Sequence, residues 1–486
     1  MADVVVVGAG VGGLAAAIRL RAAGHAVQVF ERNEVVGGKL ATRRFDGFTF
    51  ETGPSLLTLP RVFDDLLAVA GTSLADELDL VRLDPVCRYR FTDGSAFDVR
   101  ADPAHTAAEL DAWSSGAGAG WRRFLDRGAR TWEVAERTFF AGPMGSPLRL
   151  VGRMRSPLDL VAIDSMVSLD QRARSTFDDP RLVAWADRYA TYSGSSPTAA
   201  PATLACIPAI EQDEGAWYVR GGLGRLAEVL GDVAGRLGVG ITCGVDVERI
   251  VRHRRRVVGV QAGGVDHPAD VVVVNADAHH LYADLLPHRR ALARVDRAPR
   301  SSSGFVLLLG VDGLTDRLAH HNVSFPADYA AEFTDLFERR APVLDPAVYV
   351  CCSAVTDPAQ APDGCENWFV LVNAPSGGST DWAREALGYR DHLLEVMARR
   401  GWDLTGRIRS EEVITPADIA SRYRAHGGAI YGTSSNGRAA AFLRPGNRGP
   451  LRGLYLVGGS SHPGGGLPLV AISGRIVADL VAADGA

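Results

Sequence analysis

The sequence predicts an α/β protein that begins with a strand, a helix and a second strand. A run of β-branched residues over 3–7 leads directly into the glycine-rich stretch 8–13. Apolar spacing then predicts a helix over residues 14–23, and a second strand is expected over 26–30. A glycine turn between a strand and a helix in this order predicts a Rossmann-like fold, whereas the glycine letters alone would not.

Three glycines and one acid of this unit predict a bound dinucleotide. Gly8 permits the tight turn, Gly10 lets the backbone approach a pyrophosphate, and Gly13 lets the helix pack closely on the strand. The pyrophosphate would lie against the unpaired N–H groups at the positive end of the helix. Glu31 ends the second strand, where an acid accepts hydrogen bonds from the adenosine ribose.

Two further glycine clusters test how specific this interpretation is. Residues 116–120 have similar letters but no strand before them, so we expect a loop there. Residues 221–224 open a helix predicted over 225–237, without the strand entry that a pyrophosphate site needs. Neither cluster predicts a second dinucleotide site.

A middle stretch and a C-terminal stretch continue the α/β pattern. Strands are expected over residues 239–243, 245–253, 257–262 and 271–275. The C-terminal stretch is a strand ending in Gly458 and Gly459, a glycine-rich loop over 460–468, and a helix over 469–482. Pro468 is well placed for the first turn of that helix.

A second fingerprint follows the ribose acid. Arg32 is followed by Gly37, Gly38 and Lys39, and Lys39 is the only lysine of the chain. A paired glycine with a basic residue at this place resembles the second fingerprint of the glutathione-reductase-like FAD proteins. The resemblance is greatest to the subgroup of amine oxidases, carotenoid desaturases, and Rab escort and GDI proteins. It implies FAD as the cofactor, with the positive end of the C-terminal helix directed at the flavin ring.

These motifs and the resemblance together define a candidate cofactor site. The resemblance implies that the backbone at Val247 clamps the adenine and that residues 275–277 lie near the cofactor. The candidate cofactor-binding residues are Gly8, Gly10, Gly13, Glu31, Arg32, Gly38, Lys39, Gly53, Pro54, Val247, Gly458, Gly459, Gly466 and Leu467.

The FAD-binding domain is therefore expected to be discontinuous, with residues 1–70, 215–285 and 440–486. Residues 71–214 and 286–439 would form an inserted α+β substrate domain. In this arrangement, distant parts of the chain meet around one cofactor.

Much of the chain resembles bacterial phytoene desaturases and related carotenoid desaturases. The stretches that carry this resemblance are residues 191–205, 215–222, 320–325, 355–365 and 460–466. The loop from His462 to Pro468 departs from the phytoene desaturase form and is more similar to hydroxycarotenoid and diapocarotene desaturases. The resemblance implies FAD-dependent removal of a hydride and a proton from a hydrophobic isoprenoid. Without a second dinucleotide motif, oxygen or a quinone is expected to reoxidise the flavin.

No general base stands out from the sequence. His462 lies in the loop expected beside the flavin and is the candidate catalytic residue, although a histidine before proline in a tight loop is often structural. Arg220 either faces the FAD or is an ordinary cation at a strand end. Both pairs of alternatives stay open at this point.

Three other functions agree with parts of the sequence. An FAD oxidase of a smaller amine or natural-product substrate would have a short polar pocket with a charged anchor, whereas a polyene needs a long apolar one. A non-catalytic lipid or prenyl carrier of the same fold would not need the intact glycines and Glu31. An NAD-dependent dehydrogenase explains only the first glycine motif.

Composition excludes several classes of protein. The 486 residues are 47% hydrophobic and 22% charged, as in soluble globular proteins, and the apolar runs fall far short of the roughly eighteen residues that span a bilayer. Lys+Arg 52 against Asp+Glu 57 gives a net charge of −5, which predicts no nucleic-acid partner.

The six cysteines form no CxxC pair, and Cys351 and Cys352 would alternate faces on a strand. We therefore expect no metal site, and reduced thiols in a cytoplasmic protein.

The segment 139–169 is apolar with interleaved arginines. This pattern is typical of an interfacial helix that dips into anionic headgroups, and a lipid-soluble substrate needs an entry route. A lid helix of the substrate domain, buried on one face, is the alternative. The protein is thus expected in the cytoplasm, either free or peripheral on the inner face of the cell membrane, and its oligomeric state is left open.

Overall fold

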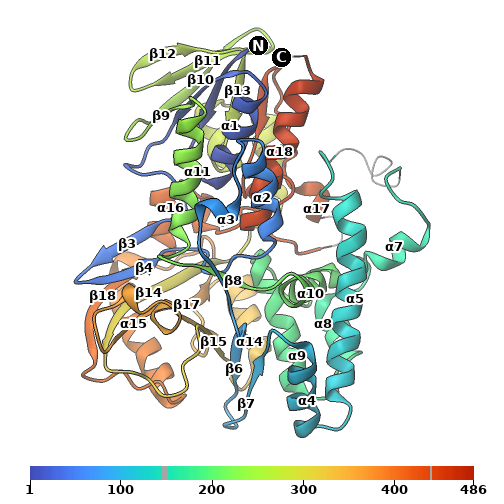
Figure 1. The fold of residues 1–486 in the computed structure, drawn as a ribbon, viewed down its shortest axis with the longest axis vertical. Coiled ribbons are helices and arrows are strands. Elements are labelled where there is room, and N and C mark those ends of the chain that lie inside the picture. Colours follow the sequence, from blue (N-terminus) through green and yellow to red (C-terminus); the bar gives the residue numbers. More distant parts are fainter. Residues whose placement is uncertain (145–151, 438–439, 486) are drawn as a thin grey trace.

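The computed structural model describes residues 1–144, 152–437 and 440–485, and each of its two halves is built on one large sheet (Figure 1). The half that carries both chain ends contains a five-stranded parallel sheet of order β19-β13-β1-β2-β9. Its strands are β1 (Asp3–Val7), β2 (Ala26–Phe30), β9 (Gly240–Thr242), β13 (Val271–Val274) and β19 (Leu454–Leu456). The predicted α/β class is confirmed.

Burial on both faces explains why valine dominates the central strands of this sheet. Val4 and Val6 of β1 face a helical layer, whereas Val5 and Val7 face a second, smaller sheet. The helical layer is α1 (Val11–Ala22), α11 (Gly224–Arg236) and α18 (Leu467–Ala483). The smaller sheet is antiparallel and consists of β10 (Val247–His253), β11 (Arg256–Ala262) and β12 (Val265–Pro268).

The other half is built on a seven-stranded sheet of order β18-β14-β17-β16-β15-β6-β7, antiparallel except between β15 and β6. Its strands are β6 (Cys87–Arg90), β7 (Ala96–Val99), β14 (Ser303–Asp312), β15 (His321–Ser324), β16 (Val348–Cys352), β17 (Cys365–Ala374) and β18 (Ile408–Ile414). Helix α15 (Trp382–Arg399) packs on one face. The hairpin of β3 (Thr42–Phe45) and β4 (Phe48–Glu51), together with α16 (Pro416–Tyr423), packs on the other.

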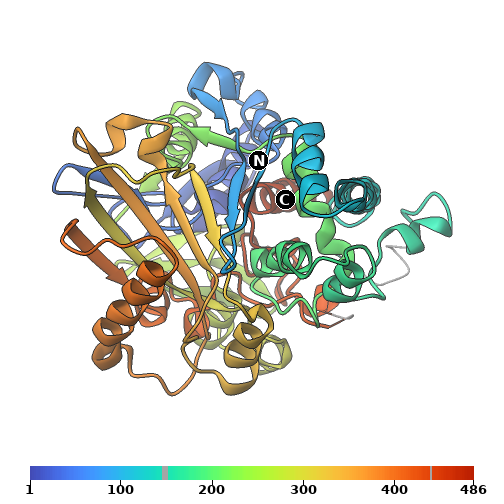
Figure 2. The same cartoon turned by 90° about the horizontal axis from the view of Figure 1, so that it is seen from below.

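A group of helices packs beside β6 and β7, on the right of the sheet in Figure 2. It consists of α4 (Pro103–Trp113), α5 (Ala117–Thr138), α8 (Leu169–Arg174), α9 (Pro180–Asp187), η1 (Arg188–Ser193), η2 (Ala202–Ala205) and α10 (Cys206–Asp213). Short helix α7 (Leu158–Ala162) projects from this group, away from both sheets (Figure 1).

The loop expected at residues 116–120 is wrong, because α5 begins at Ala117. A Cβ on Gly118 would lie 2.2 Å from the carbonyl oxygen of Ala107, so this glycine lets α5 pack directly on α4. The cluster therefore serves helix packing, which a search for loop signals does not detect.

The remaining elements are short and lie in the connections between the strands and helices named above. They are α2 (Pro60–Ala68), α3 (Leu74–Glu77), β5 (Leu80–Arg82), β8 (Trp217–Val219), α12 (Ala278–His280), η3 (Leu281–Leu285), α13 (Arg289–Arg297), α14 (Tyr329–Thr334), η4 (Asp335–Arg339), η5 (Ser353–Val355), η6 (Pro358–Gln360), η7 (His426–Gly428) and α17 (Ala440–Leu443). None of the helices in the described ranges is both long and apolar enough to cross a membrane.

The chain alternates between the two large sheets. The parallel sheet takes strands from residues 3–30, 240–274 and 454–456, and the mixed sheet takes strands from 87–99 and 303–414. This alternation is compatible with a discontinuous cofactor domain, whose boundaries stay a prediction. One small sheet, β5 with β8, joins stretches that those boundaries assign to different domains.

Candidate functional site

A large cavity lies where the two halves meet, and the predicted cofactor motifs from both ends of the chain line it. The turn after β1, the stretch around Lys39, the start of β10 and the first turn of α18 all contribute to its wall. The predicted cofactor residues in the wall are Gly8, Gly10, Glu31, Arg32, Gly38, Lys39, Gly53, Pro54, Val247, Gly459, Gly466 and Leu467.

The N-terminus of α1 opens directly into this cavity. Gly10 is its N-cap and has no side chain to satisfy the first N–H groups, and Gly10, Val11 and Gly12 line the cavity. A helix end of this kind, with the positive end of the helix dipole, suits a pyrophosphate. The structure therefore places the predicted phosphate cradle on the cavity wall.

Gly13 and Gly458 support this cradle from behind rather than lining it. A Cβ on Gly13 would lie 2.1 Å from the carbonyl oxygen of Gly8, so only glycine lets α1 approach the β1 turn. A Cβ on Gly458 would lie 2.3 Å from Oδ1 of Asn275, whose Nδ2 donates to the Gly8 carbonyl at 3.3 Å. Asn275, which directly follows β13, thus lies against both the turn at Gly8 and the turn at Gly458.

Glu31 is held in a fixed orientation at the end of β2. Its side chain is buried, Oε2 accepts the N–H of Ala9 at 2.8 Å, and Oε1 accepts the backbone N–H and Nδ2 of Asn33 at 2.9 and 2.7 Å. Oε1 uses both of its acceptor positions on Asn33, whereas Oε2 keeps one further lone pair for a ligand. An acid fixed this way in the cavity wall fits the predicted role of binding a ribose.

Lys39 and Arg32 connect the cradle to the other half. The Lys39 ammonium donates to the carbonyl of Ile430, and burial lowers its pKa to about 8, an effect that Asp277 opposes. Arg32 donates from Nη1 to the Ser421 carbonyl at 3.0 Å. Both cations therefore lie on the cavity wall, where phosphate oxygens would meet them.

The second helix end in the cavity belongs to α18. Its N-cap is Gly466, again without a capping side chain, and Gly466, Leu467 and Pro468 line the cavity. Gly474 lets α18 pack against Ala15 of α1, because a Cβ there would lie 2.8 Å from the Ala15 Cβ. Two uncapped helix ends in one cavity fit FAD, which needs one for its pyrophosphate and one for its flavin ring.

His462 does not lie in the cavity wall. Its ring is fully buried, packs edge-on against Phe139 with ring centroids 4.7 Å apart, and Nε2 lies 3.1 Å from the carbonyl oxygen of Gly142. Burial lowers its pKa to about 4, so the ring is neutral near pH 7. The candidate catalytic role is therefore replaced by a packing role behind the loop.

Arg220 also lies outside the cavity wall. Its side chain is half exposed, and Nε donates to Oδ2 of Asp79 at 2.7 Å. Arg220 is therefore the ordinary cation at a strand end and does not face the cofactor cavity.

The part of the cavity opposite the cradle is called the chamber here. It is lined mainly by residues of the mixed-sheet half. Its apolar residues are Leu56, Ile207, Val306, Phe369, Leu371 and Ile430. Its polar residues are Ser55, Thr58, Arg188, Thr191, Tyr192, Glu211, Ser302, Tyr349 and Asn373. Sequence reasoning assigned a role to none of these, although the stretch 191–205 was singled out for its resemblance.

Tyr349 presents its hydroxyl to this chamber in a fixed position. The hydroxyl lies 2.6 Å from Oγ of Ser55 and 2.8 Å from Nδ1 of His321. Burial raises the Tyr349 pKa well above its ordinary value and lowers that of His321 well below it. All three groups are therefore neutral near pH 7.

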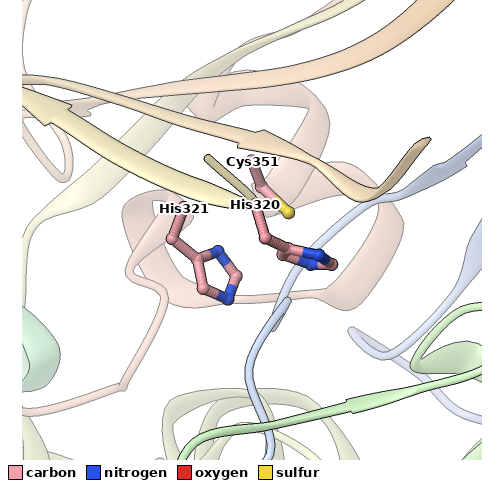
Figure 3. Close-up of side chains that lie close together, drawn as sticks. All are labelled: His320, His321 and Cys351. Atoms are coloured by element: carbon pink, nitrogen blue, oxygen red, sulfur yellow. The ribbon is translucent and has the colours of Figure 1, made fainter. Parts of the chain in front are cut away.

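His320, His321 and Cys351 cluster behind Tyr349 (Figure 3). One ligand atom of each lies within 4.8 Å of the others, and all three side chains are buried. These residue types bind zinc, but burial raises the pKa of the Cys351 thiol well above its ordinary value, and binding would require its proton to leave. The sequence reasoning missed the cluster because it compared Cys351 only with Cys352, whereas strand pairing sets Cys351 beside His321.

Comparison with known proteins identifies matches over nearly the whole chain. Residues 11–482 match the family described as flavin containing amine oxidoreductase. A 4,4'-diapolycopene oxygenase of Methylomonas sp. is 38% identical over 99% of this chain and 98% of its own. A 1-hydroxycarotenoid 3,4-desaturase of Flavobacterium sp. (strain P99-3) is 32% identical over 99% of both chains.

Solved structures agree with the fold. An oxidoreductase from Methanosarcina mazei aligns over 98% of this chain and 100% of its own, with a TM-score of 0.64 and 19% sequence identity. This likeness concerns the arrangement of elements alone.

Proposed function

Because the chain belongs to the flavin-containing amine oxidoreductase family, we propose that it removes a hydride and a proton from a carotenoid-type isoprenoid and so forms a carbon–carbon double bond. It is an FAD-dependent oxidoreductase. The observation that carries the proposal is that the FAD cradle shares one cavity with a chamber whose wall includes six apolar side chains. The full-length relatives, named as a carotenoid desaturase and an oxygenase of a diapocarotene, support it.

Each wall of the cavity has a task in this reaction. FAD, when bound, supplies the acceptor for the hydride. The first turn of α1 would bind the pyrophosphate, Glu31 would bind the ribose, and the positive end of α18 would favour negative charge on the flavin. The apolar chamber side chains hold the polyene in place and exclude water.

A smaller-substrate oxidase is the second candidate, because the chamber contains a buried cation, Arg188. A charged anchor of this kind was the expected sign of an amine or a compact natural product. The apolar residues around it, and relatives of full length that are named for carotenoids, favour the desaturase.

The test uses FAD-loaded protein added to liposomes that contain acyclic carotenes, with products separated by chromatography and weighed by mass spectrometry. We expect products that have lost one hydrogen molecule per double bond, formed with oxygen or a quinone as the final acceptor. Amines and polyenes are compared in parallel anaerobic reactions. Flavin bleaching by the amines and none by the polyenes would overturn the proposal in favour of the second candidate.

We also propose that residues 158–166, called the α7 region below, touch the cytoplasmic face of the membrane. The substrate would enter the protein from there. Four large apolar side chains are exposed there: Leu158 (73%), Leu160 (54%), Val161 (66%) and Met166 (65%). The acids of the same segment point inward instead. Asp159 pairs with Arg137 at 2.7 Å, and Asp164 pairs with Arg127 and Arg172 at 2.9 and 2.8 Å.

Exposed apolar side chains together with inward-facing acids support a segment that lies at the membrane interface. A lid helix would instead bury its apolar face. Residues 145–151 of the predicted contact segment lie outside the described residues. The projection of α7 away from both sheets leaves its tip free to reach a surface (Figure 1).

A further inference from the structure

The substrate chamber contains a buried arginine without an acidic partner. Arg188 begins η1, is 9% exposed and lines the cavity. No carboxylate of the described residues lies within 4.0 Å of its nitrogens, its Nη1 donates to Oγ1 of Thr191 at 2.5 Å, and its Nε has no partner. Its guanidinium lies 5.8 Å from the ring centre of Tyr349. Most donors of a buried cation are thus unused by the protein itself, which is unusual without a ligand.

A buried acid with an unused acceptor lies in the same wall. Glu211 of α10 is 3% exposed, its Oε2 accepts the hydroxyl of Tyr189 at 3.0 Å, and its Oε1 has no hydrogen-bond partner among the described residues. Burial raises its pKa to about 7, while the hydroxyls of Tyr189 and Tyr192 and the charge of Arg188 act in the opposite direction. Both residues line the same cavity, and Tyr189, which follows Arg188 in η1, joins Glu211 to that element.

Tyr192 completes the group. Although it lies among buried residues of η1, it is 38% exposed, and it lines the cavity, so its exposed surface faces the chamber. The side chain offers a hydroxyl that both donates and accepts hydrogen bonds. Donors and acceptors thus line the same chamber whose wall also carries leucine, isoleucine, valine and phenylalanine side chains.

We propose that Arg188, Tyr192 and Glu211 form a subsite for an oxygen atom, a hydroxyl or a carbonyl, carried near one end of the isoprenoid substrate. A hydroxyl can accept from Arg188 and donate to Glu211, and a carbonyl can accept from Arg188 and Tyr192. A pure hydrocarbon would leave these groups unpaired and dry, which is unfavourable. This inference rests on the proposed desaturase function and refines it: the substrate is already oxygenated when it enters.

The experiment compares three matched polyenes of equal length: the hydrocarbon, its terminal alcohol and its terminal aldehyde. Each is presented in liposomes to FAD-loaded protein, and kcat and KM are measured. For the unaltered protein we expect kcat/KM to be about 10- to 100-fold higher for at least one oxygenated polyene, the ratio expected from one charge-assisted hydrogen bond. Arg188→Leu should remove this preference, so that kcat/KM for the oxygenated polyenes falls to the value for the hydrocarbon.

Three further variants make the result specific. Arg188→Lys keeps the cation and should keep part of the preference, and Tyr192→Phe keeps the ring and should lower it without loss of flavin. Arg384→Leu removes an exposed arginine on α15, far from the chamber wall, and should change nothing. Bound flavin is measured by absorbance for every variant.

The outcomes separate this inference from the proposed function. Equal kcat/KM for hydrocarbon and oxygenated polyenes overturns the subsite and leaves the desaturase standing. Loss of FAD from both Arg188→Leu and Tyr192→Phe also overturns it, since these residues would then serve the cofactor. Turnover of none of the polyenes overturns the proposed function and the subsite with it.

Discussion

A side chain at position 10 would intrude into the phosphate cradle. A Cβ on Gly10 would lie 2.8 Å from Nδ2 of Asn275, and the methyl groups of valine would extend toward the free N–H groups of α1. We expect Gly10→Val to weaken FAD binding by at least about 100-fold, because at least two charge-assisted hydrogen bonds to the pyrophosphate are lost. Flavin absorbance per mole of purified protein checks this.

Gly235→Val is the matched control for that variant. Gly235 lies exposed in α11, and nothing comes within 4 Å of a Cβ built there. It should retain its flavin. A Gly10→Val protein with a full complement of FAD would contradict the assignment of the cradle.

The buried carboxyl of Glu51 should make stability depend on pH. Glu51 accepts the N–H of Leu223, its Oε2 has no partner, and burial raises its pKa from 4.5 to about 7. Since the folded state holds this proton more tightly, its contribution to stability is full below pH 4.5 and is lost as the pH rises through 7. We expect the free energy of unfolding of the unaltered protein, relative to Glu51→Gln, to fall by about 3 kcal/mol across this range.

Urea unfolding at pH 5, 6, 7 and 8 measures this difference. Glu395→Gln, which alters an exposed carboxyl on α15, should follow the unaltered protein at every pH. If the curves for Glu51→Gln and the unaltered protein run parallel, Glu51 does not hold its proton in the folded state.

Single residues differ in how well sequence predicts their place. Gly8, Gly10 and Glu31 could be predicted because their tasks depend on backbone geometry within one βαβ unit. His462 is the candidate because it lies in the loop expected beside the flavin, yet its ring packs against Phe139. Side-chain direction in an irregular loop depends on packing against segments distant in sequence, which no local pattern encodes.

At the scale of elements, the α7 tip carries the membrane prediction. Replacing Leu160 and Val161 by aspartate places two charges where apolar side chains would enter the bilayer interface. Flotation with anionic liposomes at low salt should recover the unaltered protein with the vesicles and leave the double variant in the soluble fraction, at least about tenfold depleted. Its flavin content should not change.

Leu314→Asp is the control for this experiment. Leu314 is 75% exposed in the connection between β14 and β15 and is not part of the α7 region. This variant should float like the unaltered protein. Equal recovery of all three proteins with the vesicles would mean that the α7 tip does not make the contact.

Elements with strong periodicity were predicted nearly to the residue. The strand over 26–30 is β2, the helix over 225–237 is α11 within one residue at each end, and the strand over 257–262 is β11 with one residue added. The helix α5 was missed at its start because glycines at 116–120 usually break helices. Close contact with α4 outweighs that propensity, and this contact is tertiary.

At the scale of the whole molecule, the sequence predicted the meeting of the two chain ends and an apolar chamber beside the flavin, but not the residues that line this chamber. The N-terminal and the C-terminal glycine motifs each predict contact with the cofactor. Because both would contact the same FAD molecule, the two chain ends are expected to lie side by side. The chamber residues come from η1, α10 and three strands of the mixed sheet. No periodic pattern marks them, because what they share is a side of a cavity rather than a face of one helix or strand.

The contribution of residues 459–467 to the same cavity as Gly8 orders events during biosynthesis. The ribosome makes the pyrophosphate turn first and the flavin-facing helix last, and β19 pairs with β13 only after the intervening strands have emerged. The two helix ends can therefore hold one cofactor together only after α18 has been made. A folded chain without its cofactor would lack the stabilisation that a bound ligand gives to the folded state.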